Sequence, residues 1–269
     1  MRHSVVLDLK KCRGCTTCIK NCPTEAIRVR SGKATILPNR CIDCGTCIRV
    51  CPHKAVKSVC DDFSALKNYR YTIAIPDPAL YGQFQNLDDV DIVLNGLLEL
   101  GFDQVYEAAA ACEMLSGFAR ERILKEPDRP MPEISPACPA VVRLISIRFP
   151  KLINHIAPVI TPSEFAAITV RQQAVRDTGL SPEEIGVFSI VPCSSLVTAA
   201  HSPVGLPHPV LDGAFAIRDV YLALLGPMKR LDKDHLKPLS ASGILGVGWA
   251  YVGGESAGRL RERYVAVDG

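Results

Sequence analysis

The sequence lacks any long hydrophobic run. Across its 269 residues, the most apolar stretch covers residues 210–226, and Asp212, Arg218 and Asp219 interrupt it. A helix that spans a bilayer needs about 20 consecutive apolar residues. We therefore expect no membrane span.

A strong excess of charge of one sign is missing as well. The formal net charge is +3, and the lysine and arginine residues are scattered without a long basic run. Nucleic-acid-binding proteins commonly gather their basic residues into a patch or stripe. The sequence therefore does not indicate a nucleic-acid partner.

A secretory start is also absent, because residues 1–11 contain an apolar stretch of only three residues, 5–7. A signal peptide needs a longer apolar region of about 7–15 residues. The chain nevertheless contains 12 cysteines. In a reducing compartment, cysteines serve metal binding or catalysis more often than disulfides. We therefore predict a cytoplasmic protein that binds metal.

Two cysteine runs near the N-terminus have the same spacing. Each has the pattern C-x2-C-x2-C-x3-C-P, and the runs start 29 residues apart, at residues 12 and 41. Bacterial ferredoxins hold [4Fe-4S] clusters with this spacing, and the fourth cysteine of each run binds the other cluster. We predict that cluster I is held by Cys12, Cys15, Cys18 and Cys51. We predict that cluster II is held by Cys41, Cys44, Cys47 and Cys22.

Zinc sites and disulfides explain this pattern less well. Zinc sites usually use two CxxC pairs some distance apart, not four cysteines within eleven residues. A disulfide framework is typical of small secreted domains. Because each oxidised cluster with its thiolates adds roughly −2 charges, the loaded protein should be near neutral or slightly acidic. Clusters of this kind are sensitive to oxygen, so we expect the cytoplasm of an anaerobe.

The N-terminal region is an internal repeat, which we predict to form an α+β ferredoxin-like domain over residues 1–62. Each half should contain a cluster loop, a short helix, a turn and a strand. In the first half we expect the turn at residues 31–33 and the strand at residues 34–37. So small a unit has little apolar core, so bound metal must supply much of its stability.

The remaining chain, residues 70–269, alternates expected strands and helices. We predict strands at residues 71–75, 102–107, 185–191 and 210–216. We predict helices at residues 88–100, 108–124, 140–147 and 219–225, the last ending at Gly226-Pro227, and a tight turn at residues 246–254. Such alternation indicates an α/β domain with a mostly parallel sheet.

Two further cysteines lie where a strand-like segment is followed by a helix. Cys138 precedes Pro139 and an apolar helix, and Cys193 follows an expected buried strand. A thiolate at a helix start faces the positive end of the helix dipole, which lowers its pKa and suits an anionic cluster. Parallel sheets also bind ligands at the carboxyl ends of their strands. We interpret Cys112 as a structural residue and Cys60 as a spare thiol.

With these features the chain resembles the iron-only ([FeFe]) hydrogenases over nearly its whole length. The resemblance rests on the ferredoxin-type start and on residues 71–84, 137–139, 192–193 and 210–219. The first and last of these segments, 71–84 and 210–219, resemble the sensory branch of the family. It implies that Cys138 and Cys193 are two of the four cysteines that bind an active-site cluster. That cluster joins a four-iron cubane to a two-iron unit with carbonyl and cyanide ligands.

Three departures limit what the resemblance implies. Ala137 stands where active hydrogenases usually carry a proton-relay cysteine, and Leu196 where a lysine often pairs with a cyanide. No cysteine follows Cys193, although the family supplies two more ligands there. We therefore expect no catalytic residue, little or no hydrogen turnover, and an active-site cluster only in a longer form, with this chain ending before the last ligand motif.

The leading hypothesis is a hydrogenase-like iron–sulfur protein of the sensory type. It would pass electrons between an external carrier and the α/β domain. The expected partners are a redox protein (ferredoxin or reductase) and hydrogen. Two alternatives are a ferredoxin-type electron-transfer protein whose second domain only docks a partner, and an iron–sulfur cluster assembly factor.

Overall fold

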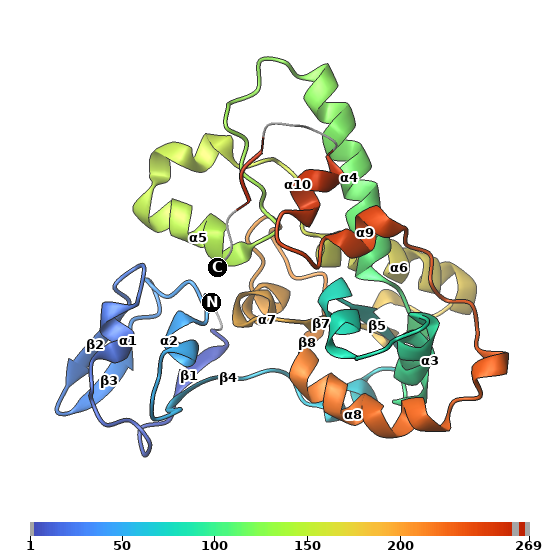
Figure 1. Cartoon of the computed structure of the whole chain (residues 1–269), viewed down its shortest axis with the longest axis horizontal. Coiled ribbons are helices and arrows are strands. Elements are labelled where there is room, and N and C mark those ends of the chain that lie inside the picture. The colour runs from blue at the N-terminus through green and yellow to red at the C-terminus, as the bar shows by residue number, and fades with distance from the viewer. Residues whose placement is uncertain (1–2, 260–263, 267–269) are drawn as a thin grey trace. The chain divides into compact units, whose positions relative to one another are not determined.

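The computed structural model describes residues 3–259 and 264–266 (Figure 1). Its contacts divide the chain into two compact units, each drawn from several segments. The first unit takes its residues from Met1–Asp61, Pro130–Ile160 and Cys193–Pro209, and the second from Asp62–Arg129, Thr161–Pro192 and Val210–Gly269. Both units therefore combine segments that are distant in the sequence.

Within residues 3–61, 130–160 and 193–209, the first unit contains two small antiparallel sheets and four α-helices. Its strands are β1 (Val5–Leu7), β2 (Ile27–Arg30), β3 (Lys33–Ile36) and β4 (Val56–Ser58). Its helices are α1 (Thr17–Lys20), α2 (Thr46–Arg49), α5 (Pro139–Arg148) and α7 (Ser194–His201). Strand β1 pairs with β4, and β2 pairs with β3. The strand expected at residues 34–37 is thus present one residue earlier, as β3.

The sequence repeat reappears in the backbone of this unit. Residues 29 positions apart share a left-handed conformation, which few residues other than glycine, asparagine and aspartate adopt readily. The matching positions are Gly14 and Asp43, Thr16 and Gly45, and Glu25 and Lys54. Each half therefore folds its cysteine loop and short helix in the same way.

The second unit is built around a parallel sheet. Its strands are β5 (Tyr71–Pro76), β6 (Gln104–Val105), β7 (Ile185–Val191) and β8 (Gly213–Ala216), in the order β6-β5-β7-β8. All three strand pairs are parallel, so the predicted mostly parallel sheet is confirmed. The helices of this unit are α3 (Asp91–Glu99), α4 (Ala108–Lys125), α6 (Pro162–Thr178), α8 (Ile217–Arg230), α9 (Ile244–Gly248) and α10 (Gly254–Gly258).

The core of the second unit lies on this sheet. Every residue of β7 is buried, as expected for a central strand covered on both faces. The rings of Phe188 and Phe215 stack with centroids 5.3 Å apart, and Leu94 of α3 and Leu224 of α8 belong to the same buried cluster. Burial of these side chains supplies the main driving force for folding of this unit.

Several predicted boundaries were wrong. Helix α8 does not end at Gly226-Pro227 but continues to Arg230, with Pro227 inside it. Its face formed by Val220, Leu224 and Pro227 is buried, and that packing outweighs the hydrogen bond that proline removes. Strand β6 has two residues instead of six, and α3 begins at Asp91 rather than 88. Among the helices that the structure describes, none is long and apolar enough to cross a membrane.

The turn predicted at residues 246–254 is present only over residues 249–253, because the short helices α9 and α10 occupy the two ends of the segment. Both pack against α4, as Figure 1 shows in red and green. Gly246 lies so close to the backbone of Ala109 that a β-carbon would not fit. The glycines therefore permit close helix packing rather than a loop.

Candidate metal centres

Four of the predicted ligands line one cavity in the N-terminal repeat. Three come from the first half and one from the second, and they are Cys12, Cys15, Cys18 and Cys51. The other side chains around them are largely apolar and include Leu7, Val29 and Val56. An apolar shell limits the access of water to a cluster and so affects its reduction potential.

The other four predicted ligands line a second cavity in the same unit. Here three come from the second half and one from the first, and they are Cys41, Cys44, Cys47 and Cys22. The structure thus brings together both crossed sets of four thiols. Four sulfur donors in an apolar setting fit a [4Fe-4S] cluster, and binding by these eight residues remains a prediction.

Backbone amides point at several of these sulfur atoms. The N–H of Ala26 donates to Cys22 Sγ at 3.2 Å, and that of Ala55 donates to Cys51 Sγ at 3.3 Å. These two bonds occupy equivalent positions of the repeat. Amide hydrogen bonds to sulfur stabilise negative charge on it and help to set a cluster's potential.

Protonation of the thiols differs between exposed and buried positions. Burial raises the pKa of Cys41 and of Cys47 to about 12, and neighbouring negative groups add to the effect. In contrast, a hydrogen bond with the Thr17 hydroxyl lowers the pKa of the exposed Cys15. Because iron binds the thiolate form, loading the second cavity must release protons.

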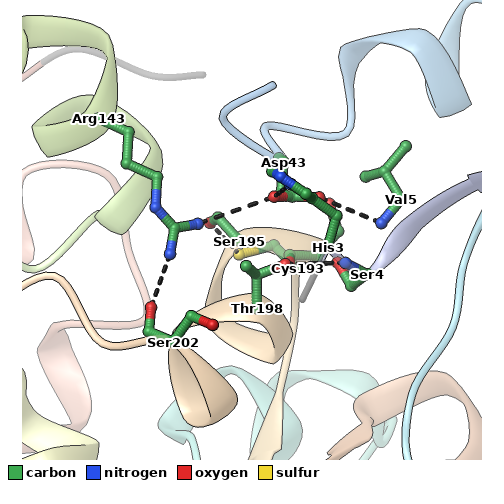
Figure 2. A network of polar contacts seen from close by, with 10 residues as sticks. His3, Ser4, Val5, Asp43, Arg143, Cys193, Ser195, Thr198 and Ser202 are labelled. Carbon is green, nitrogen blue, oxygen red and sulfur yellow. Dashed lines mark hydrogen bonds and ion pairs between the residues drawn. The ribbon is translucent and has the colours of Figure 1, made fainter. Parts of the chain in front are cut away.

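Asp43 is a buried acidic residue of the second cysteine loop that sequence reasoning missed. Its carboxylate accepts a hydrogen bond from the Val5 N–H at 3.1 Å and lies 2.6 Å from His3 Nδ1. Arg143 of α5 approaches it with Nη1 at 3.8 Å (Figure 2). The alignment of the two halves could have revealed it, because Asp43 replaces the glycine found at position 14.

Hydrogen bonds attach helix α7 to the same loop. The Ser194 hydroxyl donates to the Asp43 carbonyl at 2.7 Å, and the Ser4 hydroxyl donates to the Ser194 carbonyl at 2.7 Å. The Ser4 N–H donates to Thr198 Oγ1 at 3.0 Å, as Figure 2 places them. Because α7 begins directly after Cys193, this network positions Cys193 relative to the second cavity.

Cys138 and Cys193 occupy equivalent positions at the starts of two helices, α5 and α7. Cys193 Sγ lies 3.2 Å from the Ser195 hydroxyl. The expected lowering of the Cys138 pKa was wrong. The surrounding protein atoms raise the pKa of this thiol, although N–H groups of the helix start oppose them.

The remaining cysteines lie elsewhere. Cys112 is buried within α4 in the second unit, and burial raises its pKa. Cys60 is half-buried shortly after β4 and is not among the residues that line either cavity. Ala137 and Leu196 flank the Cys138 and Cys193 positions, and neither side chain carries a proton donor.

Two protein families match different parts of the chain. Residues 70–197 match the family described as iron only hydrogenase large subunit, C-terminal domain. Residues 4–52 match the 4Fe-4S dicluster domain. The second match contains all eight predicted cluster ligands and ends one residue after the last of them, Cys51.

Curated relatives support the same grouping. The chain is 30% identical over 210 residues to the periplasmic [Fe] hydrogenase large subunit of Nitratidesulfovibrio vulgaris, covering 71% of this chain and 50% of that protein. It is 26% identical over 126 residues to iron hydrogenase 1 of Clostridium pasteurianum, covering 46% and 22%. The chain therefore spans half or less of the length of these relatives.

Solved structures show a related fold. Two variants of the [FeFe]-hydrogenase HydA1 from Chlamydomonas reinhardtii align with a TM-score of 0.50 at 19% identity. The alignments cover 68% and 70% of this chain, and 52% and 56% of the hydrogenase chains. At this identity, the likeness concerns the fold.

Proposed function

From the premise that the chain carries a 4Fe-4S dicluster domain and an iron-only hydrogenase large-subunit domain, we propose that it is an electron-transfer protein of the sensory hydrogenase type. The observation that carries the proposal is the pair of four-cysteine cavities, and the loop of the second is hydrogen-bonded to Ser194, the residue after Cys193. Electrons would pass between an external redox protein (ferredoxin or reductase) and the hydrogenase-like domain. Its proposed location is the cytoplasm.

The proposed domain organisation assigns residues 1–62 to an α+β ferredoxin-like domain and residues 70–269 to the hydrogenase-like domain. Two antiparallel strand pairs and two short helices support the first assignment. Cluster I would use the first cavity, with Cys51 crossing from the second half. Cluster II would use the second cavity, with Cys22 crossing from the first half.

Cys138 and Cys193 are proposed as two ligands of a third, active-site cluster in a longer form of the protein. When bound, that cluster supplies the site at which hydrogen binds and is split. Two thiols at adjacent helix starts can hold one side of such a group, and the polar network around Asp43 and Ser194 fixes the position of one of them. No cysteine follows in this chain to complete the set.

Ala137 and Leu196 are proposed to make hydrogen turnover slow. A methyl group at 137 cannot accept or deliver a proton beside Cys138, and an isobutyl group at 196 cannot donate a hydrogen bond to a bound cyanide. Such a site would still bind hydrogen and report its presence through the redox state of the two ferredoxin-type clusters.

Substitution at position 137 tests this proposal in the longer form, matured without oxygen. We expect Ala137→Cys to increase hydrogen oxidation at least 10-fold, because positioned proton transfer typically contributes 10²–10⁴-fold. Thr169→Cys places a thiol on α6, outside the unit that contains Cys138, and should change nothing. Fast turnover by the unmodified protein, or no gain from Ala137→Cys, would contradict the proposed role.

A second function, plain electron transfer, needs only the eight cysteines that line the two cavities. In that case the hydrogenase-like domain only docks a redox partner. Infrared spectroscopy of the anaerobically matured protein separates the two functions, because carbonyl and cyanide ligands give bands that cubane clusters lack. Two cubane clusters without such bands would favour the second function.

A further inference from the structure

Arg143 connects three segments that each carry a candidate cluster ligand. It belongs to α5, which begins after Cys138. One guanidinium nitrogen, Nη2, donates to the Ser202 carbonyl at the end of α7 at 2.7 Å, and Nη1 lies 3.8 Å from Asp43 Oδ2 in the second cysteine loop. Figure 2 shows the guanidinium extended between these two contacts.

The guanidinium is buried and incompletely satisfied. Its side chain is 11% exposed and that of Asp43 is fully buried. Within the described residues, Nη1 has no hydrogen-bond partner, because 3.8 Å is too long for a hydrogen bond to Asp43. A buried donor without an acceptor costs about 1–3 kcal/mol, so this nitrogen requires an acceptor that the protein does not supply.

A cluster in the second cavity would supply that acceptor. Arg143 and Cys41 line the same cleft, together with His3 and Asn39. Sulfur atoms on this side of a bound cluster would therefore face a buried cation.

A buried cation changes how easily a cluster accepts an electron. Each oxidised cluster with four thiolates carries about two negative charges, and reduction adds one more. A nearby positive charge and a hydrogen bond to sulfur stabilise the reduced form more than the oxidised form, and low polarity strengthens the effect. The carboxylate of Asp43 offsets part of the positive charge of Arg143, but it does not weaken a hydrogen bond from the guanidinium to a cluster sulfur.

We propose that Arg143 positions and tunes cluster II by donating a hydrogen bond from Nη1 to one of its sulfur atoms, and so makes cluster II easier to reduce. The inference rests on the proposed assignment of cluster II to Cys41, Cys44, Cys47 and Cys22. The resulting potential would draw electrons toward cluster II, whose loop is hydrogen-bonded to the residue after Cys193.

A redox titration of the two-cluster protein, followed by electron paramagnetic resonance, tests the proposal. In Arg143→Gln we expect reduction of cluster II to become about tenfold less favourable, which is about 59 mV for a one-electron couple. Cluster I serves as the internal reference and should not shift. Arg143→Lys keeps the charge but loses the planar donor fork, so its shift should be smaller.

Arg148→Gln is the matched control. Arg148 lies on the same helix and pairs with the exposed Glu25 at 3.1 Å, so its removal takes away the same charge without a buried donor. An equal shift in Arg148→Gln and Arg143→Gln, or an unchanged cluster II potential in Arg143→Gln, would overturn the proposal.

If Arg143→Gln fails to bind iron, a measurement on the protein without substitutions tests the proposal instead. Protein grown with ¹⁵N-guanidino arginine should show a ¹⁵N coupling to reduced cluster II in pulsed electron paramagnetic resonance, and Arg143→Lys should lack it. Absence of the coupling in the unmodified protein would overturn the proposal. A chain without two clusters would instead contradict the proposed function itself, and this inference with it.

Discussion

Gly14 and Asp43 occupy the same position in the two halves of the repeat, and they meet different surroundings. Gly14 has φ +66°, and a β-carbon there would lie 2.5 Å from the Gly32 carbonyl oxygen. Asp43 has φ +53° and directs its carboxylate into a polar network. One half of the repeat thus uses this position for close backbone packing, and the other uses it for charge.

Gly14→Ala should therefore damage the first cysteine loop. A clash with backbone, added to the cost of a left-handed conformation, should lower the free energy of unfolding by about 3 kcal/mol. Gly32→Ala is the control, because Gly32 has φ +69° but no atom within 4 Å of a β-carbon, so about 1 kcal/mol is expected. Denaturant unfolding measures both, and equal losses would show that the clash is not the cause.

Some contacts between single residues could not be predicted from the sequence. The cysteine spacing predicted which thiols lie together, because the spacing itself encodes the loop. Asp43 and Arg143 are 100 positions apart and belong to no motif, so only the folded chain shows that they meet. For Cys138, N–H groups of the helix start lower the pKa as the sequence indicated, but the surrounding protein atoms raise it more.

At the scale of elements, the attachment of α7 to the N-terminal residues deserves a direct test. Thr198 is buried, and its hydroxyl accepts the Ser4 N–H at 3.0 Å. Thr198→Val keeps the shape but leaves that N–H without an acceptor, so we expect a loss of about 2 kcal/mol in stability. Thermal unfolding followed by circular dichroism provides the measurement.

Thr169→Val is the corresponding control in α6. The Thr169 hydroxyl donates to the Phe165 carbonyl of its own helix, and such bonds contribute little to helix stability. We expect a change within about 0.5 kcal/mol. If Thr198→Val unfolds at the same temperature as Thr169→Val, the contact with Ser4 does not hold α7 in place.

Element boundaries were predictable where local signals agreed with packing. Helix α5 begins at Pro139, one residue before the predicted range, because proline suits a first helical position. Helix α8 continued through Pro227 because its buried face outweighed the local signal. The short helices α9 and α10 were missed because their glycines, read as a turn, serve close packing on α4.

At the scale of the whole molecule, the two cavities predict how the chain depends on iron. Cys15→Ser should reduce the iron content from about eight atoms to about four, and the repeat should unfold at lower temperature because metal binding supplies folding energy. Iron and sulfide analysis of protein purified without oxygen measures this loss. Cys60→Ser is the control, since Cys60 lines neither cavity, and it should retain all eight iron atoms. Equal iron in both variants would remove Cys15 from the ligand set.

The crossing of Cys22 and Cys51 between the two cavities has a consequence for the origin of the repeat. A half-length ancestor could have built this arrangement only by pairing with a second copy of itself, since each centre borrows one thiol from the other half. Fusion of two copies into one gene would have made that pairing intramolecular, and therefore independent of the concentration of the protein in the cell.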